Sequence, residues 1–227
     1  MPLNTYQQIQ QLKDHYNTIG QHFAQTRRKK IQAEFVPFIK MIKNGMKVLD
    51  VGCGSGRLLA ELRGKQIDYL GLDFSQELLK QAKNQYKSRK FLLRDITTED
   101  GWNKVGKYDA VFCLSVLHHI PDRRRQHELL QQMYWHTKPG GFMFMAVWNL
   151  WHLRFFKLHL KQISKKLQYG DLSYIWVPYS ISDGNKIVKT VDRFCNGFFA
   201  GEILGLVKQV GFKVDTFYYA SRGKIHK

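Results

Sequence analysis

The stretch KVLDVGCGSGR, from Lys47 to Arg57, decides the fold of this 227-residue chain. Its apolar start is typical of a buried strand, and the RLLAELR segment that begins at Arg57 is typical of a helix. Gly52, Gly54 and Gly56 lie between them, and glycine lets a backbone approach a ligand closely because it has no Cβ and tolerates positive φ. The stretch therefore predicts a strand, a glycine-rich loop and a helix that together bind a nucleoside cofactor.

The spacing of these glycines discriminates between cofactors. A dinucleotide-binding loop needs G-x-G-x-x-G, whose third glycine would fall on Arg57. A P-loop needs Gly-Lys-Ser/Thr, which is missing. The remaining D-x-G-x-G-x-G pattern, which starts at Asp50, resembles the first motif of class I S-adenosylmethionine-dependent methyltransferases, whose loop passes around the methionine part of the cofactor. A glycine-rich turn without a ligand is the alternative.

Acidic residues follow the next two apolar stretches. DYLGLD predicts a second strand that ends in Asp73, 19 residues after Gly54, where a carboxylate accepts both ribose hydroxyls. Ser75 fits the cap of the following helix, so capping is the weaker explanation of Asp73. FLLRDI predicts a third strand that places Asp95 at the adenine amino group and Ile96 against the ring.

Two further motifs follow along the chain. YDAVFCLS, residues 108–115, predicts a fourth strand that opens into VLHHIPD, and TKPGGFMFMAVW, residues 137–148, predicts a turn and a fifth strand after a helix at about 123–136. This alternation predicts a Rossmann-like α/β fold with a doubly wound, mostly parallel sheet flanked by helices and ligands at the carboxyl ends of its strands. The resemblance assigns cofactor binding to Tyr16, Asp50, Gly52, Cys53, Gly54, Gly56, Asp73, Phe74, Asp95, Ile96, Cys113 and Leu114.

The length predicts a single domain over residues 1–227. We expect a helical cap at 1–46, a cofactor-binding core at 47–148, a basic aromatic insertion at 149–200 before the last helix, and a final helix and strand at 201–227. The family's sheet usually closes with a further antiparallel strand. The chain offers none after KVDTFYYA, which suggests either a truncated chain or a sheet short by one strand.

The charge of the chain points to a polyanionic partner. The chain has 36 Lys and Arg against 18 Asp and Glu, a formal charge of +18, which attracts nucleic acid first and an anionic membrane surface second. A generally basic proteome is the third explanation. Cys53, Cys113 and Cys195 are far apart and predict neither a metal site nor a disulfide. No signal-peptide core and no run of 18 apolar residues occurs, so we expect a cytoplasmic protein without a membrane span.

Residues 153–167 predict an amphipathic basic helix within the insertion. Its apolar and basic residues each step by three and four, which places them on separate faces. Such a helix suits a phosphate backbone, a membrane surface or an ordinary solvated face. The apolar row is Leu153, Phe156, Leu160, Ile163 and Leu167, and the basic row is Arg154, Lys157, Lys161 and Lys165.

Segments outside the generic fold resemble the tRNA wobble-uridine methyltransferases that esterify 5-carboxymethyluridine. They are YNTIGQHFAQTR at 16–27, WVPY at 176–179 and DRFCNGFFAGEI at 192–203. The resemblance covers nearly the whole chain. The chain departs from the family's pattern where substrate is expected: it has Tyr179 in place of tryptophan, Phe194 and Cys195 in place of tyrosines, and Asn196 in place of histidine.

The resemblance implies O-methylation of a carboxylate on tRNA. An ionised carboxylate needs no general base, so catalysis consists mainly of positioning. We expect Arg27, His118 and Arg193 to position the substrate, since guanidinium groups hold carboxylates as bidentate forks. The resemblance also implies a small zinc-binding activator subunit. A small-molecule, lipid or protein acceptor, or a non-catalytic RNA-binding protein, are the competing hypotheses. The residues expected to contact the RNA are Arg28, Lys29, Arg154, Lys157, Lys161, Trp176 and Asn196.

Overall fold

The computed structural model describes residues 3–26, 35–184, 186–221 and 224–226, and its centre is a parallel sheet. This sheet has five strands in the order β3-β2-β1-β4-β5, and every neighbouring pair is parallel. The predicted doubly wound α/β fold is therefore confirmed. The strands are β1 (Lys47–Val51), β2 (Asp68–Asp73), β3 (Lys90–Leu93), β4 (Tyr108–Leu114) and β5 (Thr137–Ala146).

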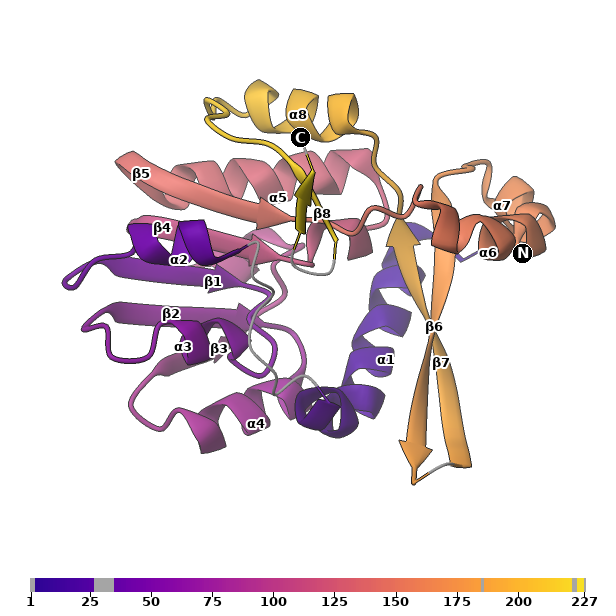
Figure 1. Ribbon diagram of the computed structural model, residues 1–227, viewed down its shortest axis with the longest axis horizontal. Helices are drawn as coiled ribbons and strands as arrows, with labels where there is room; N and C mark the ends of the chain where they lie inside the picture. Colours follow the sequence, from indigo (N-terminus) through magenta and orange to yellow (C-terminus); the bar gives the residue numbers. More distant parts are fainter. Residues whose placement is uncertain (1–2, 27–34, 185, 222–223, 227) are drawn as a thin grey trace.

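Helices cover both faces of the sheet (Figure 1). The helices α5 (Arg123–His136) and α8 (Ala200–Gln209) pack their apolar residues on one face. The helices α2 (Val36–Met41), α3 (Arg57–Glu61) and α4 (Gln76–Gln85) contribute to the apolar cluster on the other face. The predicted cap of α4 is confirmed, because the Ser75 hydroxyl accepts from the amide of Leu78.

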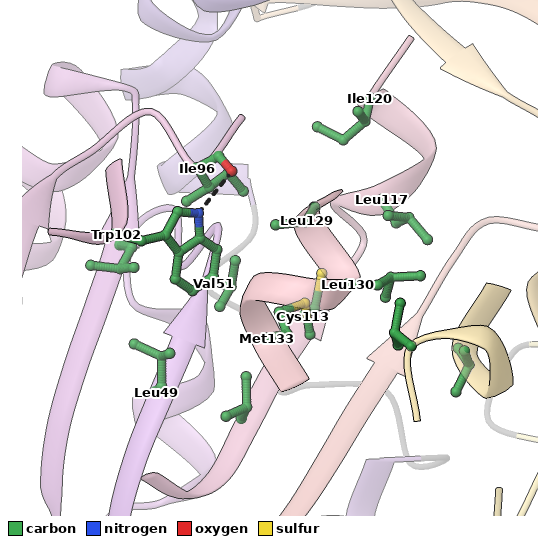
Figure 2. Close-up of a cluster of buried hydrophobic side chains, with 14 of the residues drawn as sticks. Leu49, Val51, Ile96, Trp102, Cys113, Leu117, Ile120, Leu129, Leu130 and Met133 are labelled. Atoms are coloured by element: carbon green, nitrogen blue, oxygen red, sulfur yellow. Dashed lines mark hydrogen bonds between the residues drawn. The ribbon is translucent and has the colours of Figure 1, made fainter. Parts of the chain in front are cut away.

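The core beneath α5 extends to the carboxyl end of the sheet, where the glycine-rich loop lies. Figure 2 shows Leu49 and Val51 of β1 in one cluster with Leu129 and Met133 of α5. The short helix η2 (Glu99–Trp102) closes this cluster through the indole of Trp102, which donates to the carbonyl of Ile96 at 3.0 Å. Packing of this kind fixes the ends of the strands rigidly.

A long helix and a hairpin stand beside the sheet. The helix α1 (Thr5–Thr26) lies between the α/β body and a hairpin of β6 (Tyr174–Asp183) and β7 (Lys186–Asn196) (Figure 1). The two hairpin strands are antiparallel and form a sheet of their own. The chain thus places its amino-terminal residues against a segment more than 150 residues later. No helix among the described residues is long and apolar enough to cross a membrane.

Two sequence-based expectations about elements are wrong. The single helix expected at 153–167 is divided into η4 (Leu153–Phe155), α6 (Phe156–Lys161) and α7 (Ile163–Tyr169). It breaks at Gln162, whose side-chain amide bonds to the backbone N–H and C=O of Trp176 at 2.9 and 2.8 Å. These bonds to β6 replace the regular geometry of a continuous helix.

The strand expected at 213–220 also does not join the main sheet. Only β8 (Tyr219–Ser221) is extended and paired, with β9 (Lys224–His226). Most side chains from 213 to 220 are exposed, so the segment gains little from burial. Val214 and Tyr218 are partly buried, and Tyr218 stacks on Phe38 with ring centres 5.9 Å apart.

Candidate functional site

The glycine-rich loop after β1 has the geometry that its sequence predicts. Gly52 and Gly54 adopt φ of +70° and +54°, a region that other residues rarely occupy. A Cβ on Gly52 would lie 2.3 Å from the side chain of Val116, whereas one on Gly54 would meet nothing closer than Leu78 at 3.9 Å. Gly52 is therefore required by the protein's own packing, and Gly54 leaves space for a ligand against the backbone.

Two buried carboxylates border this loop. Asp73, at the end of β2, accepts from the amides of Gly54 and Ser75, both at 2.8 Å. Asp50 accepts from the hydroxyl of Tyr69 at 2.8 Å. Burial raises the pKa of Asp50 to about 7 and that of Asp73 to about 6. The Asp73 carboxylate thus holds the loop in place and keeps lone pairs for hydroxyl donors.

The third acid of the predicted cofactor site has a partner that the sequence did not suggest. Asp95 forms an ion pair with Lys13 of α1, with Nζ and Oδ2 2.7 Å apart. Burial on its own raises the pKa of Asp95, but hydrogen bonds from Lys13 and Thr97 outweigh it and lower the pKa below its usual value. The ion pair ties α1 to the adenine end of the predicted site.

Other residues predicted to bind the cofactor lie deeper than expected. Cys113 is fully buried, and Ile96 is only 4% exposed within the core, so neither offers much surface to a ligand. Cys53 is buried beside the loop, and Leu114 is partly exposed at the end of β4. Gly56 begins α3 in the left-handed conformation. Open backbone at Gly54 and the carboxylate of Asp73 fit a nucleoside cofactor better than these deeper side chains do.

Tyr16 joins the cofactor loop to the second half of the site. Its hydroxyl is 2.9 Å from Nε2 of His119, and its ring makes an edge contact with Phe74, 6.0 Å between centres. Tyr16 also contacts Phe23 of the same helix edge-on, with ring centres 5.8 Å apart. Tyr16 thereby places α1 over the loop after β2.

A buried histidine pair follows β4. His118 and His119 lie on η3 (Leu117–His119) with ring centres 4.3 Å apart. Burial lowers the pKa of His119 to about 4 and holds the pKa of His118 well below its usual value, so both rings are neutral near pH 7. The amide of Trp148 donates to Nδ1 of His118 at 3.4 Å, which leaves the proton on Nε2. That Nε2 is buried and has no partner among the described residues.

Arg193 of β7 is the most unusual group of the site. It is 3% exposed, and its guanidinium carbon lies 4.9 Å from the ring centre of Trp148 and 5.2 Å from that of Tyr179. Its Nε and Nη1 are buried without a hydrogen-bond partner among the described residues. The guanidinium also interacts with the hydroxyl of Tyr16. A buried cation with unsatisfied N–H groups is costly, so this arrangement favours an anion as the missing partner of Nε and Nη1.

The same region contains three side chains of metal-ligand type. His118, His119 and Cys195 present ligand atoms within 4.8 Å of one another. Both nitrogens of His119 already have partners, Tyr16 and the carbonyl of Phe194. The neighbouring guanidinium of Arg193 also repels a cation. These features disfavour a metal here, and the absence of a metal site stays a prediction.

Several residues expected at the substrate lie apart from this cluster. Trp176 pairs with Phe194 and Val177 with Arg193, so Trp176 and Arg193 point to opposite faces of the hairpin. The buried side chain of Asn196 donates to the carbonyls of Ile120 and Pro121, which fixes the loop after β4. Arg154, Lys157 and Lys161 are exposed on η4 and α6, while Arg27, Arg28 and Lys29 lie outside the described residues.

Sequence reasoning overlooked three residues that the fold brings to the site. Lys13 carried no signal beyond its place on an amphipathic helix. Trp148 follows the fifth strand directly, and a position just after a parallel strand was a usable signal for the site. Ser115 follows β4 with φ of +63°, a strained value for a residue other than glycine that often marks functional loops.

Comparisons with known proteins identify the family of this chain. A family model described as a methyltransferase domain matches residues 21–216. A tRNA (carboxymethyluridine(34)-5-O)-methyltransferase of Arabidopsis thaliana is 29% identical over 133 residues, which cover 59% of this chain and 31% of that protein. A ubiquinone biosynthesis O-methyltransferase of Thiobacillus denitrificans is 32% identical over 108 residues, 46% of this chain and 45% of that protein. The chain thus spans less than half the length of these relatives.

Solved structures resemble the fold as a whole. An S-adenosylmethionine-dependent methyltransferase from Methanosarcina mazei superposes with a TM-score of 0.65 at 18% identity, covering 83% of this chain and 92% of that one. A methyltransferase-like protein from Haloferax volcanii, solved in complex with a methyltransferase activator, gives a TM-score of 0.54 at 20% identity, covering 78% and 83%. At these identities the likeness concerns the fold.

Proposed function

Because this chain belongs to the S-adenosylmethionine-dependent methyltransferases, we propose that it methylates a carboxylate on tRNA, the 5-carboxymethyl group of a wobble uridine. The cofactor supplies an electrophilic methyl group on a sulfonium. Gly54 and Asp73 would hold its methionine and ribose parts, respectively. The acceptor would enter from the side of η3 and β7, where Arg193 and His118 lie.

The unsatisfied N–H groups of Arg193 carry this proposal. Guanidinium N–H groups form strong, charge-assisted hydrogen bonds to carboxylates, and Arg193 has buried N–H groups at Nε and Nη1 without a partner among the described residues. Trp148 and Tyr179 flank the guanidinium, which fixes its plane. The Nε2–H of His118 is a further donor in the same cluster. Buried hydrogen-bond donors that lack a partner suit an anionic methyl acceptor better than a neutral hydroxyl.

The surrounding residues suit methylation without a general base. A carboxylate is ionised near pH 7, so the protein has to orient it and exclude water. His118 and His119 are neutral at that pH, so they add no second cation that would weaken the nucleophile. His118 keeps its Nε2–H for a hydrogen bond to the carboxylate. Arg193 orients the acid, and the rings of Trp148 and Tyr179 keep water from its guanidinium.

The charge of the chain supports a tRNA as the carrier of this carboxylate. A wobble base lies in an exposed loop and is able to unstack and enter a protein pocket, while phosphates meet surface cations. The formal charge of +18 supplies the long-range attraction. The activator bound to the Haloferax relative supports including such a subunit in the proposal.

The test is methyl transfer from labelled S-adenosylmethionine to total tRNA, with and without a purified activator subunit, followed by nucleoside analysis. We expect a labelled modified uridine whose methyl group is lost in mild alkali, as an ester requires. An alkali-stable labelled nucleoside would move the acceptor to a base or ribose atom. Label in a lipid or small-molecule extract, with none in tRNA, would overturn the proposal in favour of an acceptor like that of the ubiquinone-biosynthesis relatives.

A further inference from the structure

The segment from η4 to α7 exposes its apolar row to solvent. The outer row consists of Leu153, Phe156, Leu160, Ile163 and Leu167, which are 84%, 58%, 54%, 51% and 66% exposed. A surface helix normally turns such a row toward the core. This protein leaves it without a partner among the described residues, and an exposed apolar surface of this kind marks an interaction site.

Polar contacts on the opposite side prevent the outer row from turning inward. Phe155 and Leu158 pack against the small core cluster around Leu150 and Ile175. One turn later, the amide of Gln162 pairs with the backbone of β6. The buried ammonium of Lys166 then donates to the carbonyl of Leu172 at 2.8 Å and contacts His159. The polar groups of the inner face therefore already have hydrogen-bond partners, and rotation of the helices would break these bonds.

Cations border the outer row, and no acid interrupts them. Residues 151–170 contain five Lys and Arg and neither Asp nor Glu. Arg154, Lys157 and Lys161 are exposed beside the row, whereas Lys165 lies over the ring of Trp176 at 3.9 Å. Apolar side chains flanked by exposed cations are typical of helices that lie in the interface of an anionic membrane.

Other partners fit this surface less well. RNA offers phosphates to the cations but no apolar surface on which leucine and isoleucine side chains would gain by burial. A second copy of this chain carries the same formal charge of +18, which opposes close association of two such faces. An anionic bilayer satisfies both components, because its acyl boundary accepts the apolar side chains and its headgroups accept the cations.

We propose that the outer row docks this protein on the surface of an anionic lipid bilayer. The row enters the boundary between headgroups and acyl chains, and Arg154, Lys157 and Lys161 contact lipid phosphates. This inference does not depend on the proposed acceptor, because η4, α6 and α7 lie outside the cluster around Arg193. It assigns the protein a peripheral membrane surface that leaves the methyl-transfer site intact.

Flotation with lipid vesicles tests the proposal on the full chain. We expect binding to vesicles of phosphatidylcholine with about 30 mol% phosphatidylserine, weak binding to pure phosphatidylcholine, and a decrease as salt rises. The double variant Phe156→Glu, Leu160→Glu should bind the anionic vesicles about tenfold less tightly. The matched control is Leu93→Glu, because Leu93 is 50% exposed on β3 of the main sheet and should retain wild-type binding.

Companion measurements separate the competing outcomes. Cofactor binding by calorimetry establishes that each variant is folded, and light scattering and tRNA filter binding are run in parallel. Failure of the wild-type chain to float with anionic vesicles overturns the proposal, as does unchanged flotation of the double variant. A dimer that the double variant dissociates would assign the row to a second copy, and a selective loss of tRNA affinity would assign it to RNA.

Discussion

The loop after β1 and the cluster around Arg193 face the same end of the sheet, but they are built in different ways. The first is encoded in consecutive residues, where one glycine serves packing and another leaves space for a ligand. The second collects Tyr16, His118, Trp148 and Arg193 from α1, η3, the loop after β5 and β7. The cofactor half is therefore a local structure that motifs describe, whereas the acceptor half depends on how distant elements pack.

The largest expected effect on stability concerns the glycine-rich loop after β1. Gly52→Ala places a Cβ against Val116 in a left-handed conformation, so we expect a loss of about 3–5 kcal/mol in the free energy of unfolding. The matched control Gly54→Ala should cost about 1–2 kcal/mol, because only the backbone is strained. Urea unfolding measures both. Calorimetry should show that Gly54→Ala weakens S-adenosylmethionine binding in a folded protein. Equal destabilisation by the two variants would contradict the division of roles.

We expect the cluster around Arg193 to lower the stability of the protein while it supports catalysis. Arg193→Met removes a buried cation with unsatisfied donors, so we expect unfolding to cost about 1–2 kcal/mol more than in the wild type. The same change should lower kcat/KM for tRNA about 100-fold, while the affinity for S-adenosylmethionine stays unchanged. Arg124→Met, at an exposed position of α5, is the control for charge. A destabilised Arg193→Met protein with normal turnover would assign this arginine to folding.

Lowering the pH should destabilise the protein through the buried His119. The pKa of His119 falls from 6.5 in the unfolded chain to about 4 in the folded protein, so the unfolded state binds the additional proton. Stability is lost as pH falls from 6.5 toward 4, by about 3 kcal/mol for this residue. The slope of unfolding free energy against pH should be smaller in His119→Gln over that window. Parallel curves for the two proteins would show that His119 is not buried in a neutral form. Asp50 and Asp73, with raised pKa values, act in the opposite direction in both proteins.

The smallest effect concerns the affinity for the cofactor. Asp73 accepts hydroxyl donors best when ionised, and its pKa is about 6. Binding of S-adenosylmethionine should therefore weaken about tenfold for each pH unit below 6 and level off above it. Asp73→Asn should bind weakly at every pH, without this transition. A wild-type profile that is flat through this range would remove Asp73 from the ribose contact.

The failures of sequence reasoning share a physical cause. The apolar row at 153–167 indicates a helix with one buried side, but the pattern contains no information about which side is buried. Gln162 and Lys166 decide it, because their bonds to β6 and to the carbonyl of Leu172 hold the side that carries these two residues inward. Asn196 is a similar case: it was expected at the substrate, and its amide instead fixes the loop after β4. Whether a polar residue contacts substrate or a distant carbonyl depends on packing.

The sequence by itself determined the parallel sheet, the glycine-rich loop and the acids at the ends of β1 and β2. These follow from short-range periodicity and from the steric freedom of glycine, which neighbouring residues specify. Only the tertiary structure decided that Lys13 pairs with Asp95 and that the guanidinium of Arg193 lies against Trp148 and Tyr179. Such contacts join residues far apart in the chain, and their geometry is fixed when α1 and the β6–β7 hairpin pack beside the sheet.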